Sequence, residues 1–244
     1  MEEEKNTKTS KTVNGRINVI AIDGPAGSGK STIAKLLSLR LGLNYIDTGA
    51  TYRAITLLAI ENKIDPEDEE KILELAKIAK IEIDHSPKDA KDYTTVRLNG
   101  KDVTEEIRSP EVGTLVSVVS KLSGIRKFLV DFQRKIASLG PSVLEGRDIG
   151  SVVFPDAVLK IYLTADNSER VRRRQRQEKE KGKEVKTESI KKEIETRDSI
   201  DSSRKDSPLI IPEDAVVIDS TKLTIEETFK FIKELYHERL QSEN

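Results

Sequence analysis

The residues best able to do chemistry lie near the start of the chain, in the run GPAGSGKS from Gly24 to Ser31. The run fits the pattern GxxxxGK followed by Ser or Thr at every fixed position. Glycines in this pattern let backbone N–H groups turn towards phosphate oxygens, the lysine reaches the β- and γ-phosphates, and the last hydroxyl can ligate Mg²⁺. We therefore expect a site for ATP with Mg²⁺, in which Ser31 is the metal ligand. The residues that would line it are Gly24, Pro25, Ala26, Gly27, Ser28, Gly29, Lys30, Ser31 and Thr32.

The segments on either side of this motif have the pattern that the motif requires. Ile17 to Ile22 is a short apolar, β-branched run, typical of a buried parallel strand. After the motif, apolar residues keep helical spacing as far as Gly42, a common residue at helix ends. The sequence therefore predicts a strand, a phosphate-binding loop and a helix in succession.

Strands and helices alternate along most of the remaining chain. Strands are predicted at 44–47, 142–145, 159–163 and 215–218, and short hairpin-like strands over 81–99, which end at the turn dipeptide Asn99-Gly100. Helices are predicted at 51–60, from Asp65-Pro66 onwards, at 111–122, at 125–139 and after a capping box of Thr224 and Glu227. This alternation predicts an α/β fold, with a parallel sheet flanked by helices.

The sequence also suggests how the chain is divided. Residues 1–15 are polar and predicted to be a disordered tail, and residues 16–80 and 123–244 to form the core. Residues 81–122 are predicted to be a small inserted lobe. The charged stretch 167–205 has no convincing apolar face for much of its length, so we expect it to project into solvent.

The bulk composition argues against several kinds of partner. Lys and Arg (42) nearly cancel Asp and Glu (43) among 244 residues, so no whole-molecule field would hold nucleic acid or an anionic membrane. Cysteine is absent, which excludes disulfides and thiol nucleophiles. No apolar run approaches the roughly 20 residues that span a bilayer, and the polar start of the chain does not resemble a signal peptide. We expect a soluble, cytoplasmic protein.

Arginines at the predicted ends of elements suggest a second anionic substrate. Phosphoryl transfer between two nucleotides brings several negative charges together, and fixed cations must offset their repulsion. Arginine holds phosphate oxygens with two parallel hydrogen bonds, although any single arginine could equally be a solvated helix charge. The candidates are Arg53, Arg126, Arg147, Arg170, Arg173, Arg174, Arg197 and Arg204.

Four blocks in order, IAIDGPAGSGKST, YIDTGATYRA, EGRDIGSVVFPDA and RDSIDSSRKDSPL, make the chain resemble the bacterial cytidylate kinases, in the nucleoside monophosphate kinase family. The resemblance runs from about Ile17 to the C-terminal helix. It implies a parallel-sheet core, an inserted lobe that helps to grip the acceptor, an arginine-rich lid over ATP at about 167–205, and a monomer. The implied reaction moves the γ-phosphoryl group of ATP to CMP and dCMP.

The resemblance also implies roles for residues of this sequence. Thr48 and Arg53, with Arg147 and Arg197, resemble the contacts to the acceptor phosphate, and Asp201 and Arg204 those to its ribose and phosphate. Arg173 would face the ATP phosphates. Ser117, Arg126 and Asp148 match the residues that read cytosine. The implied catalytic residues are Lys30, Arg147, Arg173, Arg197 and Arg204.

The chemistry agrees with this assignment. A carboxylate such as Asp148 can accept from the cytosine amine, whereas uracil would place a carbonyl there, at a cost of about 1–3 kcal/mol. The attacking phosphate oxygen is largely deprotonated at neutral pH, so no catalytic base is needed. We therefore expect His85 and His237 to be exposed and without a catalytic role.

Alternative functions remain open. The run Asn62 to Asp65 matches the guanine-reading pattern NKxD, but it lies too close to the phosphate-binding motif, and we interpret it as a connection between helices. A kinase for another small acceptor, such as UMP or a non-nucleotide alcohol, would share the phosphate-binding motif. A nucleotide-binding protein without activity would share it too, but would tolerate loss of the arginines.

Overall fold

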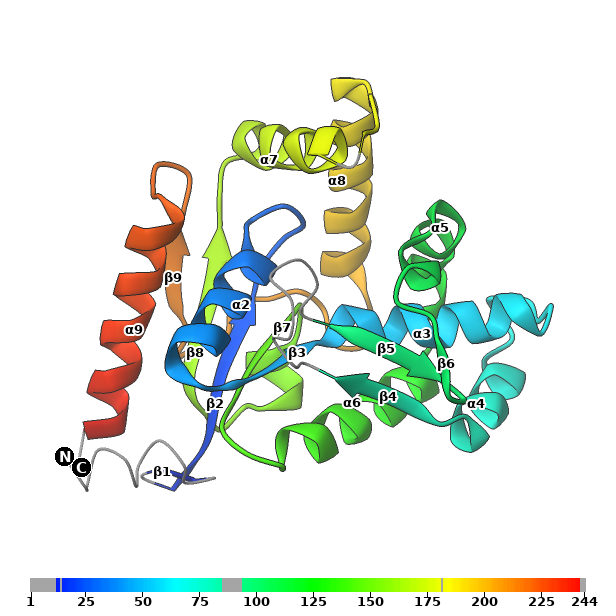
Figure 1. Cartoon of the computed structure of the whole chain (residues 1–244), viewed down its shortest axis with the longest axis horizontal. Coiled ribbons are helices and arrows are strands. Elements are labelled where there is room, and N and C mark those ends of the chain that lie inside the picture. Colours follow the sequence, from blue (N-terminus) through cyan, green and yellow to red (C-terminus); the bar gives the residue numbers. More distant parts are fainter. Residues whose placement is uncertain (1–11, 14, 85–93, 181, 242–244) are drawn as a thin grey trace. The chain divides into compact units, whose positions relative to one another are not determined.

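The computed structural model describes residues 12–13, 15–84, 94–180 and 182–241 (Figure 1). The chain divides into two compact units, of which the first comprises Met1–Leu43 and Gly140–Asn244 and the second Asn44–Leu139. The second unit contains the whole predicted lobe, 81–122, and extends beyond it on both sides. It is larger because helices on either side of the lobe share one apolar core with its strands.

A parallel sheet forms the centre of the first unit. Its strands lie in the order β7 (Ser142–Gly146), β2 (Arg16–Asp23), β8 (Ala157–Thr164) and β9 (Val216–Asp219), and each neighbouring pair is parallel. β2 lies inside the sheet, and its residues from Asn18 to Asp23 are all buried. The predicted α/β fold is therefore confirmed.

Part of the predicted tail belongs to this sheet. Thr12 and Val13 form β1, which pairs with β2 in antiparallel fashion, and the Val13 side chain is buried. The prediction of a disordered tail was wrong for these two residues, because they pair with Arg16 and Ile17 at the start of β2. Residues 1–11 and 14 lie outside the described part of the chain.

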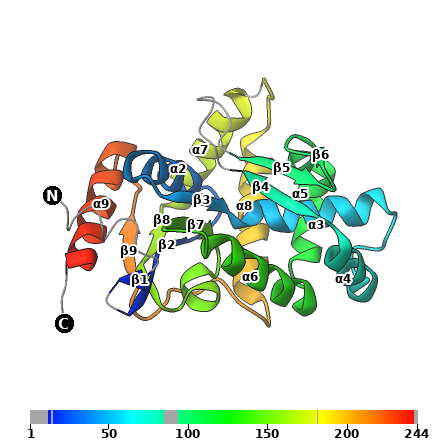
Figure 2. The ribbon, with the colours of Figure 1, turned by 60° about the horizontal axis from the view of Figure 1, so that its bottom comes forward.

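Two helices lie side by side against the sheet (Figures 1 and 2). α2 (Lys30–Leu41) stops before Gly42, as predicted, and Gly42 caps it with a left-handed φ of 69°. α9 (Ile225–Gln241) starts with the predicted capping box, in which the Glu227 amide donates to the Thr224 hydroxyl and the Glu227 carboxylate accepts from Thr224. Arg40 of α2 lies over the ring of Phe229 and pairs with Glu226, so the two helices are joined at their surfaces.

The charged stretch forms two helices with a small core of their own. α7 (Asn167–Glu180) and α8 (Thr187–Ser203) pack together through Val171, Ile190 and Ile194, all buried. The expectation of a stretch without an apolar face missed this cluster, because its few apolar residues are divided between two helices. A short π-helix, η2 (Ile149–Val153), follows β7.

The second unit combines helices with an antiparallel sheet. Its elements are β3 (Asn44–Asp47), α3 (Thr48–Glu61), α4 (Glu69–Ile78), β4 (Ile81–Asp84), β5 (Thr95–Leu98), β6 (Lys101–Asp102), η1 (Glu106–Arg108), α5 (Pro110–Val119) and α6 (Ser123–Ala137). β4, β5 and β6 form the predicted hairpins, and the positive φ angles of Asn99 (52°) and Gly100 (82°) confirm the turn.

Three local expectations have different outcomes. The helix predicted from Asp65-Pro66 begins only at Glu69, because the Asp68 carboxylate caps it at the Lys71 amide. The NKxD run does connect two helices, with Lys63 at a left-handed φ of 55°. His237 is half-buried rather than exposed, and His85 lies outside the described residues. Among the helices described, none is long and apolar enough to cross a membrane.

Candidate phosphoryl-transfer site

The phosphate-binding loop between β2 and α2 requires glycine for steric reasons. Gly24 has a φ of 148°, and a Cβ atom there would lie 2.0 Å from the backbone oxygen of Leu163 on β8. Gly29 has a φ of 97° and caps the start of α2. A side chain at Gly24 would therefore push the loop away from the sheet, and the amides of this loop could not keep their present direction.

Lys30 is buried at the base of this loop. Its Nζ donates to the Pro25 carbonyl at 2.7 Å and to the Ser28 hydroxyl at 3.4 Å, and the residue is 5 % exposed. Burial, with Arg147 as a second cause, lowers the pKa of Lys30 well below its usual range. Nearby phosphate groups would reverse this shift, because they stabilise the ammonium form.

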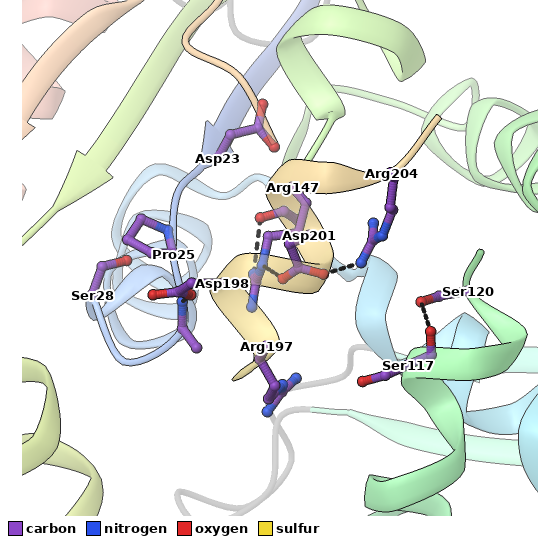
Figure 3. Close-up of polar contacts among 12 residues, drawn as sticks. Asp23, Pro25, Ser28, Ser117, Ser120, Arg147, Arg197, Asp198, Asp201 and Arg204 are labelled. Carbon is purple, nitrogen blue, oxygen red and sulfur yellow. Dashed lines mark hydrogen bonds and ion pairs between the residues drawn. The ribbon is translucent and has the colours of Figure 1, made fainter. Parts of the chain in front are cut away.

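One carboxylate joins two of the predicted arginines (Figure 3). The Asp201 carboxylate accepts from Nε of Arg147 at 2.6 Å and forms an ion pair with Arg204 on its other oxygen. Burial alone would raise the pKa of Asp201, but Arg147 and Arg204 hold it below its usual value. Two guanidinium groups share one carboxylate here, so Asp201 holds both arginines in place, and arginine is the side chain best suited to a phosphate.

The other two arginines with an implied catalytic role, Arg197 and Arg173, have different surroundings. Arg197 of α8 is partly exposed and lies 3.8 Å from Glu193. Arg173 of α7 donates to the backbone oxygen of Ser28 at 3.1 Å and to Ser220, and pairs with Glu169. Arg173 is thus attached to the phosphate-binding loop itself.

Asp23, at the end of β2, was missed by sequence reasoning. Its two carboxylate oxygens accept from the amides of Ile149 and Gly150, at 2.8 and 2.7 Å, and the residue is 1 % exposed. It thereby ties the residues that follow Arg147 and Asp148 to the strand that leads into the phosphate-binding loop. Burial raises the pKa of Asp23 to about 7, although the two amides oppose the shift.

This shift predicts a pH-dependent stability. Because the folded pKa is raised from 3.8 to about 7, the folded protein holds a proton there that the unfolded chain releases. The stabilisation is full below about pH 4 and is lost as the pH rises to 7, by an amount on the order of a few kcal/mol. Urea unfolding at several pH values should show this slope in the native protein and a flatter one in Asp23→Asn. Parallel profiles would contradict the prediction.

The second unit presents Thr48 and Arg53 at the start of α3. Asp47 caps this helix by accepting from the Ala50 amide at 3.0 Å, and its other oxygen pairs with Nη2 of Arg53 at 2.8 Å. Thr48 is buried, and its backbone oxygen accepts from the Thr51 hydroxyl at 2.7 Å. The positive end of α3 and the guanidinium of Arg53 together favour an anion.

Ser117 and Arg126 are brought together through Ser120. The Ser120 hydroxyl donates to the Ser117 carbonyl at 3.4 Å (Figure 3), and the Ser120 carbonyl accepts from Nη1 of Arg126 at 3.0 Å. The Arg126 guanidinium also lies 5.3 Å from the centre of the Tyr52 ring. Neither Ser120 nor Tyr52 was among the predicted site residues. Asp148, the third predicted cytosine contact, is buried in the first unit, directly before η2.

Comparison with known proteins decides the family. A family model described as "Cytidylate kinase" matches residues 20–238. The chain belongs to the cytidylate kinase family. It is 51 % identical to the "Cytidylate kinase" of Caldanaerobacter subterraneus subsp. tengcongensis, over 92 % of this chain and 96 % of that one. It is 48 % identical to the protein of the same name from Carboxydothermus hydrogenoformans, over 88 % and 96 % of the two chains. For that from Thermotoga neapolitana the identity is 47 %, over 91 % and 98 %.

Kinases generally use ATP with a metal ion, and the residues of this kinase fit a metal that arrives with the nucleotide. Ser31 is exposed in the first turn of α2, where its hydroxyl can contribute one oxygen ligand. No group of three His, Cys, Asp or Glu side chains in the described part of the chain could hold a metal by itself. Mg²⁺ commonly takes one or two protein ligands and completes its shell with phosphate oxygens and water.

The sequence did not predict the roles of two carboxylates of this chain, Asp23 and Asp198. Asp23 could have been noticed as an acid at the end of an otherwise apolar run, directly before Gly24. Asp198 follows Arg197 in the charged block, and its contact with the phosphate-binding loop, 172 residues away, has no local sequence signal. Acids that hold a loop in place depend on distant backbone groups.

Proposed function

We propose that this kinase transfers the γ-phosphoryl group of ATP to CMP, and also to dCMP, giving ADP and CDP or dCDP. The observation that carries this proposal is the cluster of Arg147, Asp201 and Arg204 in the same compact unit as Lys30 and the phosphate-binding loop. The cluster supplies positive charge for an acceptor phosphate, and the loop supplies amides and Lys30 for ATP. The family name and the high identity to its members support CMP as the acceptor.

Catalysis in this proposal depends on positioning and charge. Lys30 and Arg173 neutralise ATP phosphates, while Arg147, Arg197 and Arg204 neutralise the charge that develops during in-line transfer. Thr48 and Arg53 hold the acceptor phosphate, and Asp201 orients the arginines and contacts the ribose. Bound Mg²⁺, held by Ser31 and the ATP phosphates, would add further charge stabilisation. The acceptor oxygen is already deprotonated at neutral pH, so no general base is required.

We further propose that Ser117, Arg126 and Asp148 read the cytosine base. Asp148 would accept from the exocyclic amine, and Arg126 and Ser117 would donate to the ring nitrogen and carbonyl oxygen. Residues 81–122 would act as the acceptor-binding lobe and α7–α8 as the lid over ATP. The protein would act as a monomer in the cytoplasm, where both nucleotides are present.

A coupled assay of ADP release with CMP, dCMP, UMP, AMP and GMP tests the function, and Asp148→Asn tests base recognition. We expect CMP to be preferred over UMP by at least about tenfold in kcat/KM, because uracil leaves a buried acceptor unpaired. In Asp148→Asn this ratio should fall by about tenfold, since an amide can donate to the uracil carbonyl.

Two results would contradict these proposals. Equal turnover of CMP and UMP by the native enzyme would contradict the proposed recognition of cytosine and favour a kinase that accepts both pyrimidine nucleotides. No turnover with any monophosphate, together with tight ATP binding, would favour a nucleotide-binding protein without activity. Asp156→Asn is a suitable control for the selectivity measurement, because Asp156 is an exposed acid outside the proposed site.

A further inference from the structure

An ion pair between the helices α7 and α8 lies directly on the phosphate-binding loop. The Asp198 carboxylate of α8 accepts from the Ala26 amide at 3.0 Å and pairs through its other oxygen with Arg170 of α7. Nη1 of Arg170 donates to the Ala26 carbonyl at 3.1 Å. The pair therefore holds both polar groups of one loop residue, from two different helices.

The next loop residue, Gly27, also lies close to Arg170. A Cβ atom added to Gly27 would lie 3.1 Å from the backbone oxygen of Arg170 and 3.2 Å from its Cβ atom. Both side chains of the pair are largely buried, with 12 % of Arg170 and 21 % of Asp198 exposed. Water therefore screens their charges less than it screens those of a surface pair.

The charge of Asp198 creates an electrostatic problem for this site. A carboxylate on the loop that receives a triphosphate repels it, and like charges in a partly buried site are costly. The field of Asp198 already reaches Arg147 and Tyr162, because it contributes to the raised pKa of both groups. Arg170 is the cation in contact with this carboxylate, so it cancels the repulsion where the phosphates approach.

We propose that Arg170 and Asp198 are a positioning pair for ATP: Asp198 fixes the direction of the Ala26 peptide, and Arg170 neutralises Asp198. The pair also couples α7 and α8 to the state of the loop. The proposal rests on ATP as the phosphoryl donor, but it does not depend on which acceptor receives the phosphoryl group.

The proposal predicts that loss of the Arg170 cation weakens ATP binding more than loss of the Asp198 charge does. Arg170→Ala leaves the carboxylate uncompensated and should weaken ATP binding by about tenfold or more. Asp198→Asn keeps an oxygen for the Ala26 amide and removes the charge, so it should change binding less than about threefold. The double variant Arg170→Ala/Asp198→Asn should bind ATP better than Arg170→Ala alone, although it carries one more substitution.

Calorimetric titration with a non-hydrolysable ATP analogue, without acceptor, measures these affinities. A coupled assay then gives KM separately for ATP and CMP, and KM for CMP should stay within about threefold of the native value in all three variants. Arg176→Ala is the matched control, since Arg176 is an exposed arginine on the same helix, α7. Thermal unfolding shows whether each variant is folded.

Additive losses in the double variant, or equal increases of KM for both substrates, would show that the pair is merely structural and overturn the proposal. A double variant that rescues ATP binding would support it. Because the titration contains no acceptor, rescue would stand even if CMP were not phosphorylated. The failure of the acceptor assignment and the failure of this proposal are therefore separate results.

Discussion

Replacing Lys30 by Met should lower kcat by roughly 10²–10³-fold, as expected when one preorganised cation is removed from a site where negative charge develops. The thermal stability of the protein should not decrease. Lys30 is 5 % exposed, and burial is the largest cause that lowers its pKa, so the charged form is costly to bury. Met has a similar length and avoids the cost of burying a charge, so Tm should stay the same or rise.

The measurement pairs steady-state kinetics with thermal unfolding of the same samples. Lys35→Met is the control, because Lys35 lies on the same helix but outside the predicted motif. We expect it to keep the native kcat. A Lys30→Met enzyme that retains more than a tenth of the native kcat would contradict the assigned role, and a large fall in Tm would instead indicate a structural one.

Replacing Asp201 by Ala should have the largest effect on stability. Asp201 is 6 % exposed and separates two guanidinium groups, so its loss leaves Arg147 and Arg204 without their shared carboxylate. Breaking a buried ion network by removing one partner costs about 3–5 kcal/mol. The two arginines also lose their fixed orientation, so KM for CMP should rise by about tenfold or more.

Denaturant unfolding with and without CMP distinguishes this effect from ordinary loss of packing. At one fixed CMP concentration, CMP should stabilise Asp201→Ala less than it stabilises the native protein, because the variant binds CMP more weakly, whereas a loss of packing alone would leave this stabilisation unchanged. Asp206→Ala, at an exposed acid five residues further along the chain, should change neither stability nor KM. An Asp201→Ala protein with native stability and native KM would exclude the proposed role of the cluster.

The conformation of the phosphate-binding loop and its flanking elements was predictable because it depends on local chemistry. The spacing of glycines before Lys30 and the apolar run before Gly24 define a strand, a loop and a helix through backbone sterics alone. The cap at Gly42, the turn at Asn99-Gly100 and the capping box of α9 are equally local, and all three are present. The α/β class followed from the alternation of such elements.

The predicted boundaries of helices and strands were wrong where a local contact overrode the sequence pattern. Asp65-Pro66 has the composition of a helix start, yet Asp68 captures the first free amide and the helix begins after it. Thr12 and Val13 have too little apolar character to predict a strand, and they form one because they pair with the first two residues of β2.

Sequence alone thus determined the family and the phosphate-binding loop, since these depend on residue type and short spacing. Only the tertiary structure decided what holds the loop and the arginines in place. Asp201 between Arg147 and Arg204, Asp23 on the amides of Ile149 and Gly150, and Asp198 on Ala26 all join segments that are distant in the chain. Such contacts depend on the directions of buried carboxylates and amides, and these directions exist only once the sheet and its helices have packed.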